Sequence, residues 1–195
     1  MAQPRQLVLA STSRYRRELL ERLGLTFETA SPLFDETPLP AEAAAATALR
    51  LSVGKAQSLV ASFPEALIIG ADQVASSEGA RLGKPNDHHN AVRQLRFLSG
   101  KAAQFDTAVS LLDAREGKLQ SRVTGCRVVF RSLDDDRIEA YLRREQPYDC
   151  AGSAKVEGLG IALIARIETE DPTSLIGLPL IALTAMLERA GLPVV

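Results

Sequence analysis

Apolar and polar positions alternate between strand-like and helix-like patterns along most of the chain. Short apolar or alternating runs predict strands at 6–10, 26–30, 66–74, 104–113, 119–131 and 160–168. Apolar residues at helical spacing predict helices at 14–23, 41–63, 90–98, 134–145 and 179–190. Proline and glycine place a loop at 31–40 and a hairpin with a loop at 76–85. Because strands and helices interleave, we expect an α/β fold with a mixed sheet.

The first predicted helix begins with an unusual pattern of charge. In the sequence STSRYRR, Ser13 suits the N-cap position, but three arginines and no acid follow within residues 14–17. A helix N-terminus carries partial positive charge and favours acidic side chains in its first turn. A bound phosphate would offset the arginines, because free backbone N–H groups, the hydroxyl of Ser11 and the fork of Arg16 or Arg17 all suit that ligand. A solvated basic helix start is the alternative.

Two lysines could add to a phosphate site. Lys55 follows Gly54 inside the long predicted helix, where a glycine costs about 1 kcal/mol relative to alanine. A close approach of backbone or ligand would explain that glycine. Lys84 lies in a rigid Gly-Lys-Pro turn. For each lysine, an ordinary surface charge is the alternative.

Two carboxylates could hold a metal. Asp72 follows the apolar run LIIGA and stands at the carboxyl end of a predicted buried strand, where α/β sheets collect their ligands. Asp35 and Glu36 lie in the proline-rich loop. Carboxylates beside basic phosphate ligands are what metal-assisted phosphoryl chemistry needs. Turn or capping roles for Asp35 and Asp72 are the alternatives.

Composition and charge narrow the class of protein. A chain of 195 residues that is 46% hydrophobic suits one domain, or two small lobes, with a real core. A net charge of -1 gives no reason to expect nucleic acid or a membrane surface as a partner. No apolar run approaches the ~20 residues of a membrane span, and no signal-peptide pattern is visible, so a cytoplasmic location is expected.

Several ordered blocks resemble one known family over nearly the whole chain. The blocks LASTSRYRRELLERLGLTFE, DETP, IIGADQV, GKP, YDCAGSAKVEGLGIAL and LIGLPL are similar, in this order, to those of the Maf-like nucleoside triphosphate pyrophosphatases. The resemblance implies a single domain over 1–195 with a Maf/ITPase-like fold: a curved mixed central sheet, flanking helices and a deep cleft between two lobes. It also implies hydrolysis of a nucleoside triphosphate to the monophosphate and diphosphate, with Mg²⁺ or Mn²⁺.

The resemblance also implies roles for particular residues. Asp72 would accept a proton from the attacking water, and Glu36 would join Asp72 near the metal. The phosphates would be held by four residues, Ser11, Arg16, Lys55 and Lys84. The attack would fall between the α- and β-phosphates of a small-molecule nucleotide.

Three further positions resemble the branch of the family that acts on 7-methyl-GTP: Tyr15, Gln73 and Glu157. A 7-methylguanine ring is cationic, and an aromatic face attracts a cation by ~0.5–2 kcal/mol. A carboxylate such as that of Glu157 can accept from the paired donors on the guanine edge, which uracil and thymine lack. The sequence departs from this branch by carrying Tyr15 where tryptophan is usual and Arg14 where relatives often have proline.

Other functions stay open on the sequence alone. The chain could hydrolyse another triphosphate such as UTP, dTTP or CTP, release orthophosphate as a phosphatase, or bind nucleotide as a regulator of septum formation. A full set of acidic and basic site residues favours an enzyme over a regulator. The apolar segment at 174–191 permits a homodimer, although core packing would explain it equally well.

Overall fold

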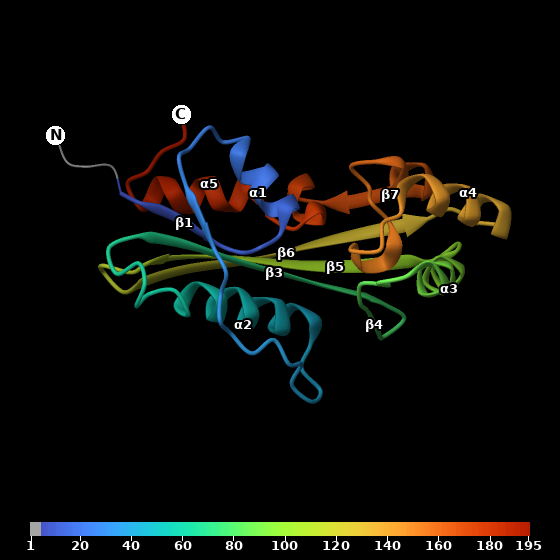
Figure 1. Ribbon diagram of the computed structural model, residues 1–195, viewed down its shortest axis with the longest axis horizontal. Helices are drawn as coiled ribbons and strands as arrows, with labels where there is room; N and C mark the ends of the chain where they lie inside the picture. Colours follow the sequence, from blue (N-terminus) through green and yellow to red (C-terminus); the bar gives the residue numbers. More distant parts are fainter. Residues whose placement is uncertain (1–4) are drawn as a thin grey trace. The chain divides into compact units, whose positions relative to one another are not determined.

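The computed structural model describes residues 5–195, which cluster into two compact units (Figure 1). The first unit combines the described part of 1–73 with Asp106–Thr124 and Asp171–Val195, and the second combines Val74–Phe105 with Gly125–Glu170. Three long strands contribute residues to both units: β3 (Leu67–Ser77), β5 (Ala102–Asp113) and β6 (Lys118–Phe130).

The strands of the described chain form one seven-stranded sheet in the order β2-β1-β3-β5-β6-β7, with β4 paired to β3. The shorter strands are β1 (Leu7–Ala10), β2 (Glu28–Ala30), β4 (Ala80–Leu82) and β7 (Ile164–Thr169). Strand β1 runs parallel to β2 and β3, whereas β4 on β3 and β7 on β6 are antiparallel. The predicted α/β fold with a mixed central sheet is therefore confirmed.

The first unit has helices on both faces of its strands. The helices are α1 (Arg14–Glu21), α2 (Ala44–Gln57) and α5 (Leu180–Arg189). Alternate side chains of a strand point to opposite faces, so Leu7 and Leu9 of β1 join a cluster with α1 and α5. Val8 and Ala10 join a second cluster, which includes Ala56 of α2. Figure 1 shows the same arrangement, with α1 and α5 on one side of β1 and β3 and α2 on the other.

The second unit holds the remaining two α-helices, α3 (His88–Leu98) and α4 (Asp135–Glu145), which pack against each other. Asp87 caps α3 by accepting from the N–H of Asn90. Asp134 caps α4 in the same way, and α4 runs from an acidic first turn to a basic last turn, as expected.

Three predicted elements differ from the structure by three residues or more at one end or both. The helix expected at 41–63 spans 44–57, because Ala41 has a left-handed φ of 57° and the chain after Gln57 tightens into turns that bond three residues back. The strand expected at 66–74 continues to Ser77. The strand expected at 160–168 starts at Ile164, since 159–163 form a 3₁₀-helix. Its Gly160 packs against the backbone of Lys155 and donates its N–H to that residue's carbonyl.

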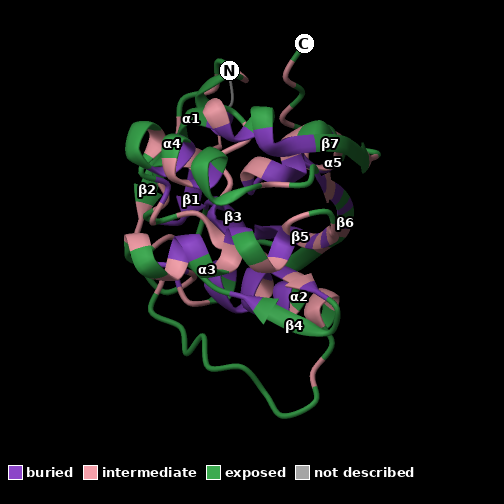
Figure 2. Cartoon of the chain, turned by 90° about the vertical axis from the view of Figure 1, so that its right-hand side faces the viewer, coloured by how far each residue is buried: buried purple, intermediate pink, exposed green. Residues whose placement is uncertain are grey.

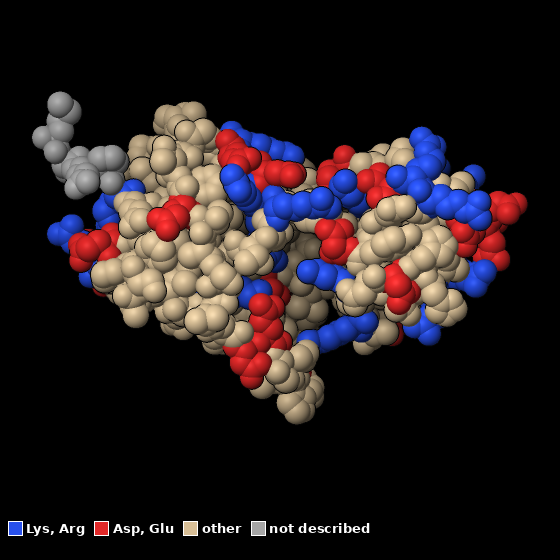
Figure 3. Space-filling model, viewed as in Figure 1, with Lys and Arg blue, Asp and Glu red and all other residues tan. Residues whose placement is uncertain are grey.

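The surface adds two general facts. Within residues 5–195, every helix is too short or too polar to cross a membrane. Basic and acidic side chains are interspersed on the face shown in Figure 3, and the net charge is -1.

The apolar side chains of α5 at 180, 183, 186 and 187 are buried in the core of the first unit. The single domain over 1–195, the cleft between lobes and the homodimer stay predictions.

Candidate functional site

The candidate site of the first unit is built around Asp72, which lies inside β3 and not at its end. The parallel pairing of β1 with β3 ends where Ala10 faces Gly70. Asp72 therefore stands just beyond the carboxyl end of β1, although its own strand continues. Its side chain is nearly buried, and the strand position removes the turn or cap role that the sequence left open.

Helix α2 brings Lys55 directly onto this carboxylate. The Nζ atom of Lys55 donates to Oδ1 of Asp72 over 2.7 Å, and both residues are buried. The contact depends on close packing, because a side chain at Gly70 would collide with the backbone carbonyl of Ser52 in α2. Lys55 is therefore no ordinary surface charge, while its role as a phosphate ligand stays a prediction.

The proline-rich loop supplies the second carboxylate. This loop, between β2 and α2, is exposed over most of its length (Figure 2), yet Oε2 of Glu36 lies 3.0 Å from Nζ of Lys55. The ring of Phe34 lies over Gly54, where an added Cβ would collide with it. A close approach thus explains the glycine in α2, although the group that approaches is the side chain of Phe34 and not backbone or a ligand. Asp35 takes the turn role, accepting from the N–H of Thr37.

A strand-to-helix turn carries Ser11 and Arg16. The Oγ atom of Ser13 accepts from the backbone N–H of Arg16, which confirms the predicted N-cap. Nη1 of Arg16 points to Oγ of Ser11 at 3.4 Å, and Nε donates to the carbonyl of Gly177 at 3.0 Å. Burial lowers the pKa of the Arg16 guanidinium, while the negative charges of Asp72 and Glu36 oppose that shift. Ser11 and Arg16 are therefore brought together, with the cation near the two carboxylates.

The neighbouring arginines have other partners. Arg17 pairs with Glu21 across one turn of α1 on the surface, so the phosphate role that the sequence allowed it lacks support. The guanidinium of Arg14 lies 4.7 Å from the ring centroid of Tyr15 and donates to its hydroxyl at 2.6 Å. The half-exposed ring of Tyr15 thus already attracts a cation, which is the property expected of a reader of a cationic base.

The amide of Gln73 is held in one orientation by three acceptors. Its Nε2 atom donates to Oγ1 of Thr107 at 2.9 Å and to the carbonyls of Ser174 and Leu175 at 3.0 and 3.1 Å. Two of these are backbone carbonyls, which cannot donate, so the nitrogen must be the atom that faces them. Gln73 consequently has its carbonyl oxygen Oε1 to offer to a ligand.

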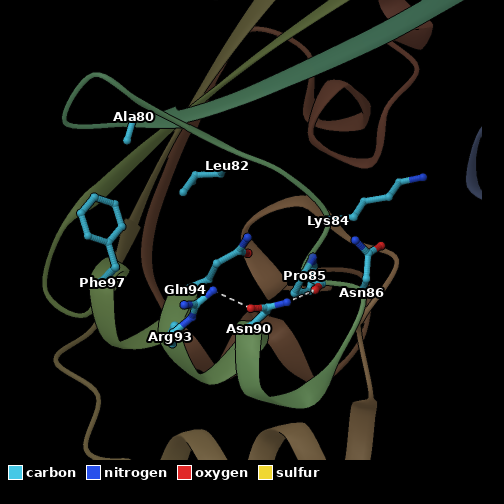
Figure 4. A pocket seen from close by; sticks show the side chains of 9 residues that line it. All are labelled: Ala80, Leu82, Lys84, Pro85, Asn86, Asn90, Arg93, Gln94 and Phe97. Carbon is cyan, nitrogen blue, oxygen red and sulfur yellow. Dashed lines mark hydrogen bonds between the residues drawn. The ribbon is translucent and has the colours of Figure 1, made fainter. Parts of the chain in front are cut away.

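The second unit carries Lys84 on a turn that is fixed by its neighbours. Gln94 donates to the carbonyl of Gly83 at 2.9 Å, and Asn90 donates to the carbonyl of Pro85 at 3.0 Å. The turn and α3 border a pocket of about 380 Å³, and Figure 4 shows the amine of Lys84 directed away from it. Within residues 5–195, Lys84 makes no ion pair and is exposed. The turn is fixed and the charge is free to meet a ligand.

Glu157 is likewise exposed on a fixed loop of the second unit. The carboxylate of Glu145 accepts from the N–H of Leu159 at 2.7 Å and pairs with Nζ of Lys155 at 3.0 Å. The hydroxyl of Tyr141 accepts from the N–H of Lys155. These contacts fix the loop from both sides, while the carboxylate of Glu157 itself is left to solvent.

The predicted metal ligands fit a small, hard cation. Glu36 and Asp72 already share one positive group, the ammonium of Lys55. In the described part of the chain, no cluster of three or more acidic, histidine or cysteine side chains could hold a metal. Two carboxylates suit Mg²⁺ or Mn²⁺ bound together with substrate phosphates, since Mg²⁺ usually takes one or two carboxylates and completes its shell with phosphate and water.

Some residues of the site gave no signal in the sequence. Phe34 packs on Gly54, and Thr107 and the backbone carbonyls of Ser174, Leu175 and Gly177 contact predicted site residues, yet none of these belongs to a charged or nucleophilic motif. Only the glycine at 54 hinted at a close neighbour. His88 contacts Tyr148 and Glu139 and, within residues 5–195, belongs to no cluster of three or more possible metal ligands.

Comparison with known proteins places this geometry in context. A family model described as "Maf-like protein" matches residues 6–190. A protein of Cupriavidus pinatubonensis named 7-methyl-GTP pyrophosphatase is 56% identical over 188 residues, which cover 96% of this chain and 94% of the relative. A protein of Thiobacillus denitrificans with the same name is 58% identical over the same shares of both chains. The solved Ham1 protein of Staphylococcus aureus is similar at 12% identity and a TM-score of 0.47, covering 65% of this chain and 72% of its own, which is too weak to carry an argument.

Proposed function

Because this chain belongs to the Maf-like protein family, we propose that it is a nucleoside triphosphate pyrophosphatase that hydrolyses 7-methyl-GTP to 7-methyl-GMP and diphosphate. The relatives that carry the name 7-methyl-GTP pyrophosphatase support the substrate. The observation that carries the chemistry is the buried contact between Lys55 and Asp72, with Glu36 on the same ammonium. This contact supports the proposal, because a carboxylate that could act as a base lies beside a cation that suits phosphates.

The charges of the first unit fit a bound triphosphate. Lys55 and the guanidinium of Arg16 carry positive charge, and the hydroxyl of Ser11 adds a donor, so these groups would hold phosphate oxygens. Arg16 is partly buried, and this burial lowers the pKa of its guanidinium. An anionic ligand would compensate the guanidinium for the hydration that burial removes. Lys84 of the second unit stays a predicted phosphate ligand.

The proposed step is a displacement at the α-phosphorus. The oxygen of a water molecule forms a bond to the α-phosphorus, and the bond from that atom to the oxygen bridging to the β-phosphorus breaks. Diphosphate leaves with the bonding electron pair. Asp72 accepts the proton that the water loses, a role that requires the ammonium of Lys55 to turn from its carboxylate to the phosphates.

A divalent metal, when bound, would neutralise phosphate charge and make the phosphorus easier to attack. Glu36 and Asp72, the two carboxylates that contact Lys55, are the residues that would hold it. The exposed position of Glu36 leaves this side open to a metal that arrives with the nucleotide.

Base selection is proposed to involve three side chains. Tyr15 presents an aromatic face to a cationic ring, and it already holds the guanidinium of Arg14 there. Gln73 offers an acceptor, because its amide hydrogens are bonded to the protein. Glu157 offers a second acceptor. Acceptors suit the guanine edge, whose N1–H and N2–H₂ are donors.

A panel of triphosphates tests this function. Wild-type protein would be supplied with 7-methyl-GTP, GTP, UTP, dTTP and CTP, with Mg²⁺ or Mn²⁺, and scored for diphosphate and orthophosphate separately. We expect diphosphate, with 7-methyl-GTP as the best substrate. A lead for UTP or dTTP would overturn the substrate, and orthophosphate as the main product would overturn the reaction class. A nucleotide-dependent complex without turnover under any metal would favour a regulator.

A further inference from the structure

The segment 171–180 of the first unit contacts two proposed substrate-binding residues at once. Its Gly177 carbonyl accepts from Nε of Arg16 over 3.0 Å. Its Ser174 and Leu175 carbonyls accept from Nε2 of Gln73. We call residues 171–180 the anchor segment. Because Arg16 lies in α1 and Gln73 in β3, this segment fixes two side chains that the sequence places far apart.

The anchor segment is itself held by Asp171. This carboxylate is 2% exposed, and its Oδ1 accepts from both the N–H and the hydroxyl of Thr173. Its Oδ2 accepts from the N–H groups of Ile181 and Ala182 at 2.8 and 3.3 Å. The carboxylate therefore sits at the N-terminus of α5, where negative charge is favourable.

Thr173 completes the cap of α5. Its hydroxyl donates to Asp171 and accepts from the N–H of Leu180 at 2.8 Å. Pro179, at the N-cap position, provides no side-chain cap. The first three N–H groups of α5 are thus satisfied by Thr173 and Asp171 from the start of the same segment, which closes it into a rigid loop.

Thr107 of β5 connects the anchor segment to Gln73. It is fully buried, its hydroxyl donates to the carbonyl of Ser174 at 2.9 Å, and the same oxygen accepts from Gln73. The hydroxyl hydrogen is donated to Ser174, and a lone pair of the same oxygen accepts from Gln73. The two bonds together fix the orientation of the hydroxyl. Valine has the same shape as threonine but lacks both functions.

We propose that Thr107 and Asp171 are positioning residues: through the anchor segment they orient the guanidinium of Arg16 toward phosphate and the amide oxygen of Gln73 toward the base. Neither touches the reacting atoms. This inference rests on the proposed function for its activity readout. It also predicts direct effects on anion binding, which do not require turnover.

The variant Thr107→Val tests the inference most sharply. We expect kcat/KM for 7-methyl-GTP to fall about three- to tenfold, the range that one lost hydrogen bond produces. We also expect the preference for 7-methyl-GTP over UTP to fall by a similar factor, because Gln73 loses a fixed orientation. Thr107→Ser keeps the hydroxyl and should restore both values. A buried threonine of β6 provides the control, Thr124→Val, since within residues 5–195 Thr124 does not bond to the anchor segment.

The variant Asp171→Asn tests the other end of the segment. Its amide keeps one acceptor but places a donor against backbone N–H groups, so the segment should loosen. We expect binding of inorganic triphosphate, measured by calorimetry, to weaken about tenfold as Arg16 loses its orientation. Thermal unfolding is recorded for every variant, and Thr107→Val is compared with Thr124→Val at equal stability loss.

The outcomes separate this inference from the proposed function. If wild type releases no diphosphate from any triphosphate, the proposed function fails, while weakened triphosphate binding by Asp171→Asn and Thr107→Val would still support the positioning role. If wild type is active but Thr107→Val matches Thr124→Val in rate, selectivity and triphosphate binding, the positioning role is overturned. Failure of Thr107→Ser to restore selectivity would also overturn it.

Discussion

The two compact units hold their candidate residues in different ways. In the first, Lys55 and Asp72 are buried and bonded to each other, and Arg16 is bonded to Ser11 and to the carbonyl of Gly177. In the second, Lys84 and Glu157 are exposed, and the hydrogen bonds belong to the residues around them.

This difference predicts that substitutions in the two units will affect different steps, the reaction itself in one and substrate binding in the other. In the first unit the charged side chains of the site are bonded to one another. Removing one of them therefore changes the electrostatic environment of the others. In the second unit the backbone is fixed and the charged tip is free, so a substitution beneath the turn should alter binding and leave the chemistry intact. We therefore propose that the first unit carries the reaction chemistry and that the second contributes to binding.

The largest effect is expected from Asp72→Asn. Loss of the base should lower the rate of diphosphate release by about 10²–10⁴-fold, the range of general base catalysis. Nucleotide binding should remain measurable, because the variant keeps the positive charges of Lys55 and Arg16. Rates come from a diphosphate assay and affinities from calorimetry. Equal turnover by wild type and variant would refute the assignment of the chemistry to this unit.

A smaller effect is expected from Gly54→Ala. The new methyl group would displace the ring of Phe34 and loosen the loop that carries Glu36. The free energy of unfolding should stay level or rise by up to about 1 kcal/mol, because alanine favours a helix more than glycine does. Activity should still fall severalfold, with a higher metal concentration needed for half-maximal rate.

Phe34→Ala is the matched variant for this prediction, since it removes the same contact from the other side. It should reproduce the change in metal dependence without the change in helix propensity. If Gly54→Ala were destabilised but fully active, the coupling of Phe34 to Glu36 would be wrong.

In the second unit, Gln94→Leu is expected to act through Lys84. The variant removes the bond to the carbonyl of Gly83 and the bond from Ser153. We expect KM to rise about three- to tenfold while kcat changes less than twofold, because the lysine keeps its charge but loses its fixed place. Arg137→Gln, on the exposed surface of α4 in the same unit, is the control. A fall in kcat as large as that in kcat/KM would remove the contrast between the units.

The smallest effect is expected from Arg14→Ala. The guanidinium of Arg14 covers one face of the Tyr15 ring, where it would compete with a cationic base. Its removal should lower KM for 7-methyl-GTP about two- to threefold relative to GTP, which lies within the range of an exposed cation–π contact. Steady-state kinetics with the two substrates measure this ratio. An unchanged or lowered preference for 7-methyl-GTP would show that Tyr15 does not read the base in this way.

Sequence patterns predicted the parts of the fold and site that depend on local order. The apolar run before Asp72, the cap at Ser13 and the charges of Lys55 and Arg16 all follow from neighbouring residues, and the structure brings these groups together. Asp72 was expected at a strand end because the run stops there, whereas pairing carries β3 five residues further.

The remaining features depend on contacts between distant segments. The short distance from Lys55 to Asp72 requires α2 to pack on Gly70, and the orientation of Gln73 requires Thr107 and the anchor segment. The spacing of apolar residues along the chain does not predict such packing. Likewise 159–163 forms a 3₁₀-helix because Gly160 packs on Lys155, although its composition is typical of a strand.

The central claim is that the charged cluster of the first unit directs water to the α-phosphorus. Hydrolysis of 7-methyl-GTP in water enriched in heavy oxygen, followed by mass spectrometry of the products, tests it most directly. If water attacks the α-phosphorus with Asp72 as the base, wild type will place the label in 7-methyl-GMP and none in diphosphate. Asp72→Asn will release almost no labelled product. Label in diphosphate or in orthophosphate would contradict this mechanism.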